Sequence, residues 1–318
     1  MKYLVTGAAG FVGSNLCTRL LSDAANTVVG VDAFRDYYDP ALKERNVRGL
    51  LAQPNFSLVR GDICSLNLDE LLQGVDVVFH EAGQPGVRSS WGNSFSTYTH
   101  DNIEATQLLL EAVTRMDRAL SRFVYASSSS VYGDAERYPT DESDRPGPKS
   151  PYGVTKLAAE HLCSLYAQAY SVPVVSLRYF TVYGPGQRPD MAFTKFLTAA
   201  TEGTEIQIYG DGSQVREFTF ISDIVEANIR SSYMDVPAGC VINLSGGSAV
   251  SVKEVIDEIR SMVERDLRVS FGAPVVGDVY RTGGSTERAR KYLEWEPQVD
   301  IASGLRLQYG WVREARGI

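Results

Sequence analysis

The chain has 318 residues, of which 44% are hydrophobic and 22% charged, and its formal net charge is −8. These values are those of an ordinary soluble globular protein with one large domain or two closely packed ones. The negative charge, without any basic run, excludes a general nucleic-acid surface, and the lack of 18 consecutive apolar residues excludes a membrane span.

Short apolar runs alternate with helical patterns through the first 180 residues. This alternation predicts an α/β fold with a Rossmann-type, doubly wound parallel sheet, in which ligands bind at the carboxyl ends of the strands. The expected strands are Lys2–Thr6, Thr27–Asp32, Phe56–Arg60, Val75–His80, Arg122–Ser127 and Val174–Arg178. The expected helices are Gly13–Ser22, Asn102–Met116 and Tyr152–Tyr170.

After residue 180 the alternation gives way to a mixed pattern that predicts a smaller α/β cap. We expect a main domain over residues 1–180, rejoined by about 219–243, and a second domain formed mainly by residues 181–318. The cap pattern contains a helix near 191–202, a turn at 211–212, the strand Val215–Phe220 and the helix Val252–Arg265, while Ile221–Tyr233 returns to the main domain.

A glycine pattern, GxxGxxG, follows the first expected strand. Gly7 allows a tight turn, Gly10 allows the backbone to approach a pyrophosphate, and Gly13 lets the helix pack closely on the sheet. The helix that begins here, with Phe11 and Val12, offers free N–H groups to phosphates. The alternative is a glycine-rich turn that binds no nucleotide.

Asp32 ends the second expected strand and indicates which dinucleotide binds. A carboxylate accepts hydrogen bonds from a ribose diol and repels a 2′-phosphate, so it favours NAD over NADP. Asp62 and Ile63, after the third strand, are expected beside the adenine, although Asp62 could instead be a helix cap. We also expect Ala82, after the fourth strand, on the cofactor side.

The segment SPYGVTK, residues 150–156, predicts a helix start that carries a general base. Ser150 is suited to the N-cap and Pro151 to the first turn. Tyr152 and Lys156 are four residues apart, so they lie on one face, where the ammonium and the helix N-terminus would lower the pKa of the phenol. The alternative is an exposed helix start with a surface lysine.

These motifs, together with the serine-rich end of the fifth strand, resemble the extended short-chain dehydrogenase/reductase family along nearly the whole chain. Three stretches, DAFRDYYDPALKERN, QPGVRSSW and RYFTVYGPGQRPDMAFTKF, look most like UDP-glucuronate 4-epimerases. The resemblance implies catalytic Ser128, Tyr152 and Lys156, bound NAD, and a UDP-sugar in the cleft below the cap. It also implies a homodimer formed through helices near 95–116 and 152–170.

The expected reaction is therefore C4 epimerisation of UDP-glucuronate to UDP-galacturonate through a transient 4-keto sugar, with hydride returned to the opposite face. Such a β-keto acid loses CO2 readily, so Ser129, Ser130 and Thr181 are expected to hold the carboxylate in an orientation that prevents this loss. The alternative is that only Ser128 acts and its neighbours satisfy turn backbone.

Related dehydratases and decarboxylases carry acidic residues at positions equivalent to Ser129 and Ser130, so the serines disfavour both reactions. The alternatives, in order, are a UDP-glucose/UDP-galactose 4-epimerase, a UDP-glucuronate decarboxylase and a non-catalytic NAD-sensing protein. The four scattered cysteines form no CxxC pair and the three histidines show no metal-ligand spacing. We therefore expect no metal and a cytoplasmic protein with reduced cysteines.

Five further residues are candidates for ligand contacts. Arg188 and Arg88 would recognise charge near the sugar or the cofactor mouth, and the resemblance places Arg216 at the diphosphate. Tyr179 would pack by the nicotinamide and Tyr209 near the uracil. The alternatives are solvated arginines, an ion pair of Arg216 with an acid such as the neighbouring glutamate, and a simple core tyrosine.

Two features near the fourth strand carry open interpretations. Asn102 is expected to begin a helix, either as a plain cap or as a structural or cofactor-linked residue. The segment Glu81-Ala-Gly-Gln-Pro85 departs from the family's usual apolar-Ala-Ala-Gln-Ala, and Pro85 could alter the loop over the nicotinamide.

Overall fold

The computed structural model describes residues 1–135, 137–246, 249–263, 265–273 and 281–317. Its centre is a seven-stranded sheet in the order β10-β6-β5-β4-β1-β2-β3, and every neighbouring pair is parallel. The strands are β1 (Lys2–Thr6), β2 (Thr27–Asp32), β3 (Phe56–Arg60), β4 (Val77–His80), β5 (Arg122–Ser128), β6 (Val174–Tyr179) and β10 (Cys240–Leu244). The Rossmann-type α/β prediction is confirmed.

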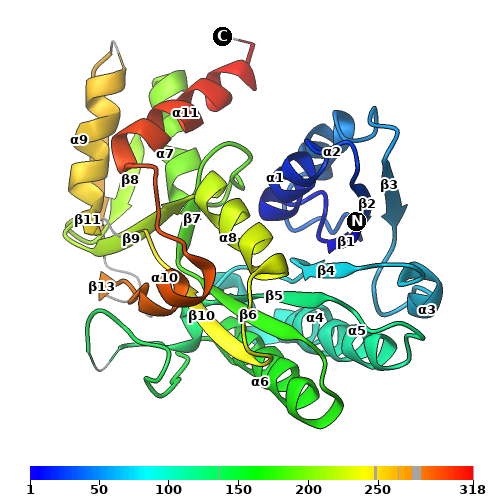
Figure 1. Ribbon diagram of the computed structural model, residues 1–318. Coiled ribbons are helices and arrows are strands. Elements are labelled where there is room, and N and C mark those ends of the chain that lie inside the picture. Colours follow the sequence, from blue (N-terminus) through cyan, green and yellow to red (C-terminus); the bar gives the residue numbers. More distant parts are fainter. Residues whose placement is uncertain (136, 247–248, 264, 274–280, 318) are drawn as a thin grey trace.

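Helices cover both faces of this sheet (Figure 1). One face carries α1 (Phe11–Leu20), α2 (Pro40–Arg48) and α8 (Ile221–Tyr233), and the other carries α3 (Leu68–Leu71), α4 (Phe95–Tyr98), α5 (Ala105–Thr114) and α6 (Pro151–Tyr170). Because side chains alternate along a strand, Val5 packs in the core beneath α1, whereas Leu4 packs in the core beneath α5.

The second part of the chain forms the cap at the upper left of Figure 1. Its helices are α7 (Ala192–Glu202), α9 (Val252–Met262) and α11 (Ile301–Glu314), and α10 (Glu287–Leu293) packs beside β10. A four-stranded sheet contains β7 (Thr181–Tyr183), β9 (Val215–Phe220), β11 (Ala249–Ser251) and β13 (Arg281–Thr282), and a two-stranded sheet pairs β8 (Ile206–Tyr209) with β12 (Val269–Gly272). The predicted strand at 215–220 and helix at 191–202 lie here.

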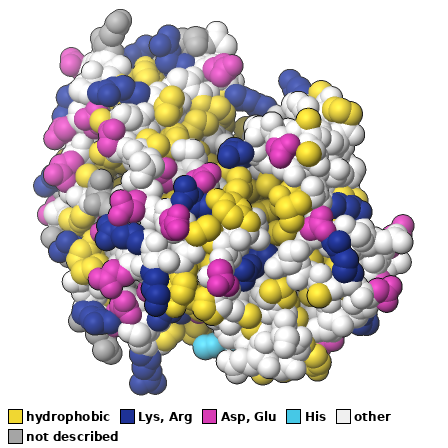
Figure 2. Space-filling view, viewed as in Figure 1, with side chains coloured by type: hydrophobic (Ala, Val, Ile, Leu, Met, Phe, Trp, Pro, Cys, Tyr) yellow, Lys and Arg dark blue, Asp and Glu magenta, His cyan; other side chains and the backbone are white. Residues whose placement is uncertain are grey.

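The cap shares a continuous hydrophobic core with the main sheet. Leu197 of α7, Ile256 of α9 and Leu305 of α11 belong to the same buried cluster as Val5 of β1. On the surface that Figure 2 shows, hydrophobic side chains gather near the place where the cap meets the part of the main domain that carries α1. The shared core holds the cap in place above the carboxyl ends of the strands.

Within the described ranges, no helix combines the length and the apolar character that a membrane crossing requires.

Candidate active site

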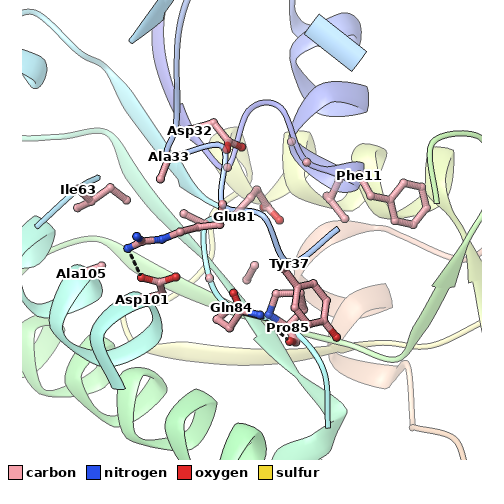
Figure 3. A pocket seen from close by; sticks show the side chains of 18 of the residues that line it. Phe11, Asp32, Ala33, Tyr37, Ile63, Glu81, Gln84, Pro85, Asp101 and Ala105 are labelled. Carbon is pink, nitrogen blue, oxygen red and sulfur yellow. Dashed lines mark hydrogen bonds and ion pairs between the residues drawn. The ribbon is translucent and has the colours of Figure 1, made fainter. Parts of the chain in front are cut away.

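A pocket opens at the carboxyl ends of the parallel strands, beneath the cap (Figure 3). Its lining includes every residue that the sequence assigned to the cofactor: Gly7, Gly10, Phe11, Val12, Gly13, Asp32, Asp62, Ile63, Ala82, Tyr152, Lys156 and Tyr179. These residues come from six separate segments, so the fold brings together in one cavity a set that the sequence presents far apart.

The glycine-rich turn between β1 and α1 shows why glycine is required here. Gly7 has φ +69°, and a Cβ on it would lie 2.9 Å from the backbone nitrogen of Ala82. A Cβ on Gly13 would lie 2.2 Å from the carbonyl oxygen of Gly7. Gly10, the N-cap of α1, offers no side-chain oxygen to the N–H groups of the first turn. The turn therefore fits the pyrophosphate of a dinucleotide.

Asp32 is buried and is fixed by three donors. Its Oδ2 accepts from the Ala9 N–H at 3.1 Å, and its Oδ1 accepts from the Phe34 N–H at 2.7 Å and from Lys43 Nζ at 3.1 Å. Lys43 also lines the pocket. Lys43 was not predicted from the sequence, although its place in DYYDPALKER, shortly after Asp32, could have indicated it.

The end of the pocket beside Asp62 contains a guanidinium that was not predicted from the sequence as part of the site. Arg35 pairs with Asp62 Oδ2 at 2.7 Å and with Asp101 Oδ1 at 2.9 Å, and Figure 3 draws the pair with Asp101 as a dashed line. Asp62 also accepts from the Cys64 N–H at 3.0 Å and pairs with His100 at 2.9 Å. Asp62 thus satisfies a local turn and faces the cofactor pocket.

The Asp62–His100 contact belongs to a small cluster of potential metal ligands. Asp62, Cys64 and His100 each offer one ligand atom, and these atoms lie within 4.8 Å of one another. However, Asp62 is already paired with a guanidinium and an imidazole. Burial raises the pKa of the Cys64 thiol to about 12, so the thiol stays protonated. We assign no metal to this cluster.

The start of α6 has the predicted geometry. The Ser150 side chain accepts from the Gly153 N–H at 3.1 Å as the N-cap, and Pro151 occupies the first turn. Tyr152 and Lys156 both face the pocket. The Lys156 Nζ donates to the Ala126 carbonyl at 2.9 Å, which ties α6 to the end of β5.

The prediction that Lys156 and the helix N-terminus give Tyr152 a lowered pKa is wrong when only the protein's own groups act on it. Burial raises the pKa of Tyr152 above its usual value, and a hydrogen bond with Ser128 and the charge of Arg188 oppose this only in part. Burial also lowers the pKa of Lys156 to about 8. The sequence showed the spacing of the pair but not how deeply both groups are desolvated.

The four serines at the end of β5 and just after it have different environments. The Ser127 hydroxyl donates to Glu160 at 2.6 Å in a buried contact. Ser128 accepts from the Ser130 N–H at 3.1 Å, and its side chain acts to lower the pKa of the Tyr152 phenol. Ser129 and Ser130 begin a short 3₁₀ helix, Ser129–Val131, and are partly exposed. Ser128 is therefore the serine that the structure couples to Tyr152.

The expected substrate residues divide into two groups. Arg188 lines the pocket, pairs with Asp190 at 2.9 Å and acts electrostatically on Tyr152. The others lie outside its lining: Arg88, whose guanidinium is 5.1 Å from the ring of Tyr209, which is also outside; Arg216, which bonds the Val215 carbonyl; and Ser128, Ser129, Ser130 and Thr181. A substrate portion that reached them would extend beyond this cavity toward the cap.

Asn102 does not begin a helix, so that prediction is wrong. It lies inside the π-helical segment Thr99–Glu104, between α4 and α5, and is buried. Its Oδ1 accepts from the Gln84 N–H at 2.7 Å, and its Nδ2 donates to the Gln84 carbonyl at 3.1 Å and to Thr155 at 2.9 Å. Asn102 therefore fixes the segment after β4 against α6.

That segment contributes four lining residues that were not predicted as site residues: Glu81, Gly83, Gln84 and Pro85. Glu81 Oε1 accepts from the Tyr179 hydroxyl at 2.9 Å. Burial raises the pKa of Glu81 to about 7, against the opposing effects of the Tyr179 hydrogen bond and the Lys156 charge. In the sequence, the departure of this segment from the family pattern was the feature that could have indicated that its residues belong to the site.

The glycine turn, the buried Asp32 at the end of β2 and the Tyr–Lys pair in one pocket define a Rossmann-type protein with a dehydrogenase-like site. Comparison with known families agrees with this class, because the NAD dependent epimerase/dehydratase family matches residues 3–244. The chain belongs to the NAD dependent epimerase/dehydratase family.

Individual relatives are similar over nearly their full lengths. An uncharacterised UDP-glucose epimerase, YtcB of Bacillus subtilis, is 41% identical, with 96% of each chain covered. A structure of UDP-glucuronic acid 4-epimerase from Bacillus cereus, in complex with UDP-glucuronic acid and NAD, has a TM-score of 0.95 and 40% identity over 99% of this chain and all of that one. MoeE5 in complex with UDP-glucose and NAD has a TM-score of 0.89 and 40% identity, with 99% and 100% covered.

Proposed function

We propose that the chain is an NAD-dependent nucleotide-sugar 4-epimerase that interconverts UDP-glucuronate and UDP-galacturonate. The observation that carries the proposal is the one pocket that Tyr152, Lys156, the glycine turn and Arg188 share, with the Ser128 side chain acting to lower the pKa of Tyr152. The similarity to the Bacillus cereus enzyme over nearly the whole chain supports the choice of substrate. Residues 1–180, rejoined near 219–243, would bind the cofactor, and 181–318 would bind most of the UDP-sugar.

The residues of the chain divide the chemistry between them. Tyr152 takes the proton of the sugar 4-hydroxyl, Ser128 holds the 4-oxygen, and Lys156 keeps a positive charge at this end of the pocket. Bound in the pocket, NAD would supply the hydride acceptor for C4 and a positive charge that lowers the pKa of neighbouring acids. The transient 4-keto sugar then turns, so that hydride returns to its opposite face and inverts C4.

Arg188 supports a uronate over a neutral sugar. It is the guanidinium that acts on Tyr152, and its fork can pair with a carboxylate through two hydrogen bonds. In the free protein this fork is held by Asp190, at 2.9 and 3.0 Å. If a substrate carboxylate took the place of Asp190 as the partner of Arg188, the sugar would lie beside Tyr152, the general base.

We expect Arg188→Lys to lower kcat/KM for UDP-glucuronate by about 10- to 100-fold and to leave slow turnover of UDP-glucose nearly unchanged, because lysine lacks the planar fork. Steady-state kinetics with both substrates measure this, and Arg137→Lys, an exposed pair with Asp144, is the matched control. An equal loss for the two substrates would favour the UDP-glucose/UDP-galactose reaction, to which the MoeE5 complex with UDP-glucose points.

The serine-rich end of β5 supports a role in preventing decarboxylation. Ser129 and Ser130 are partly exposed and adjacent to Ser128, and Thr181 follows the parallel neighbour β6. Their hydroxyls can donate hydrogen bonds to a carboxylate without adding a negative charge. Such hydrogen bonds would keep the carbon–carbon bond between C5 and the carboxylate out of alignment with the π system of the C4 carbonyl.

The double variant Ser129→Ala with Ser130→Ala is expected to release CO2 and UDP-pentose at a rate comparable with epimerisation. Proton NMR of the products, with the wild-type protein run in parallel, measures the ratio. Clean epimerisation by the double variant would mean that Ser128 alone acts and that its neighbours serve the turn.

The remaining contacts of the UDP-sugar and the assembly belong to the same proposal. Arg216 would meet the diphosphate, Tyr209 would lie near the uracil, and Arg88 would recognise charge near the sugar or the cofactor mouth. A homodimer would bury the exposed side chains of Val154, Leu165 and Tyr170 on α6. The four cysteines are unpaired, which supports a reducing, cytoplasmic location.

A further inference from the structure

One carboxyl group in the pocket has no part in the chemistry described so far. Glu81 directly follows β4 and lines the pocket, partly exposed to it. In Figure 3 its side chain lies between the labelled side chains of Asp32 and Gln84. Its Oε1 accepts from the Tyr179 hydroxyl at 2.9 Å, and the same hydroxyl accepts from Asn228 Nδ2 at 2.8 Å. The carboxyl group is therefore held in place from β6 and α8.

The titratable groups that face Glu81 are Tyr179 from β6, Lys156 from α6 and Cys17 from α1. Burial keeps the pKa of Tyr179 and of Cys17 well above neutrality, so both stay protonated. Lys156 thus supplies the positive charge that faces Glu81, and the Glu81 charge raises the pKa of Lys156 against its burial. A carboxylate and an ammonium share the reacting end of one pocket.

Resting on the proposed function, we propose that Glu81 offsets the charge of Lys156 and thereby sets the preference of the site for the oxidised nicotinamide over the reduced one. The oxidised ring is a cation and the reduced ring is neutral. An ammonium nearby disfavours the cation, and a carboxylate on the same pocket favours it. This preference assists return of hydride to the sugar, because it disfavours the reduced cofactor while the 4-keto sugar is present.

The test compares occupancy by NAD+ and NADH in the purified protein. The protein is equilibrated with excess NAD+ and NADH in equal amounts, passed rapidly through a desalting column, and its released nucleotides are quantified. At pH 8 we expect Glu81→Gln to shift the bound ratio toward NADH by at least about tenfold, because a unit charge within about 12 Å at an effective dielectric of about 20 contributes at least this much. At pH 6 the wild-type protein and Glu81→Gln should bind NAD+ and NADH in the same ratio, because Glu81, with a pKa of about 7, is then mostly protonated.

Two further variants separate charge from structure. Glu81→Asp keeps the charge and should keep the wild-type ratio at pH 8, whereas Asp69→Asn removes an exposed carboxylate on α3 and should change nothing. Lys156→Met should shift the bound ratio toward NAD+ relative to the wild-type protein. Within this variant the bound ratio should favour NAD+ more at pH 8 than at pH 6, because Glu81 titrates in that range. This last variant tests the proposal even if Glu81→Gln does not fold.

An unchanged ratio in Glu81→Gln at pH 8, or a flat pH profile in Lys156→Met, would overturn the proposal. Neither readout requires turnover of any sugar. A protein that binds both nucleotides with the expected ratios but does not epimerise UDP-glucuronate would contradict the proposed function and leave the role of Glu81 standing.

Discussion

Tyr152→Phe is expected to lower kcat for epimerisation by about 10³-fold while NAD remains bound. The substitution removes the phenolic hydroxyl, whose pKa Ser128 acts to lower, and keeps the ring, which packs edge-on against Tyr98 with ring centroids 6.3 Å apart. The pocket should therefore keep its shape and lose only the proton acceptor. Product formation from UDP-glucuronate and the nucleotide released on denaturation measure the two effects separately.

Tyr170→Phe provides the matched control for this prediction. Tyr170 lies at the end of the same helix, α6, and is 62% exposed, so loss of its hydroxyl should leave kcat within about twofold of the wild-type value. If Tyr152→Phe retained more than a tenth of the wild-type rate, another group would have to accept the 4-hydroxyl proton, and the assignment of Tyr152 as general base would fail.

The second large effect concerns stability. Glu160 on α6 and Arg178 on β6 form a buried pair, with Arg178 Nη2 2.6 Å and Nε 2.9 Å from the carboxylate, and Ser127 also donates to it. Glu160→Gln leaves the Arg178 guanidinium buried without its counter-charge. We expect a loss of about 3–5 kcal/mol in the free energy of unfolding, because the desolvation of one charge is then uncompensated.

Urea unfolding followed by circular dichroism measures this loss. The control is Asp257→Asn, which breaks the exposed pair with Arg260 on α9 and should cost less than about 0.5 kcal/mol. A loss under about 1 kcal/mol in Glu160→Gln would contradict the account of a buried, charge-dependent contact between α6 and β6.

The cofactor side of the site could be predicted from the sequence because its requirements are local. A turn with φ +69° at Gly7 and the close approach at Gly13 leave room only for glycine, so the pattern appears directly in the chain. The six predicted strands were visible for a similar reason, since strands buried on both faces are continuous apolar runs. The N-cap at Ser150 is equally local.

The features that were missed depend on residues distant in the sequence. Arg35 meets Asp101 across 66 positions, and Glu81 meets Tyr179 across 98, so neither contact has a local pattern. The pKa of Tyr152 was predicted in the wrong direction because spacing places Lys156 nearby but does not reveal the burial of both groups. Asn102 was misread because its three hydrogen bonds reach Gln84 and Thr155, not its own helix start.

The central claim is that this chain inverts C4 of UDP-glucuronate with NAD recycled within the pocket. The most direct measurement is proton NMR of the purified protein with UDP-glucuronate and no added cofactor. Our account predicts the signals of UDP-galacturonate, with no pentose and no net formation of NADH. No change in the sugar signals even after addition of NAD, or release of UDP-pentose as the main product, would contradict it.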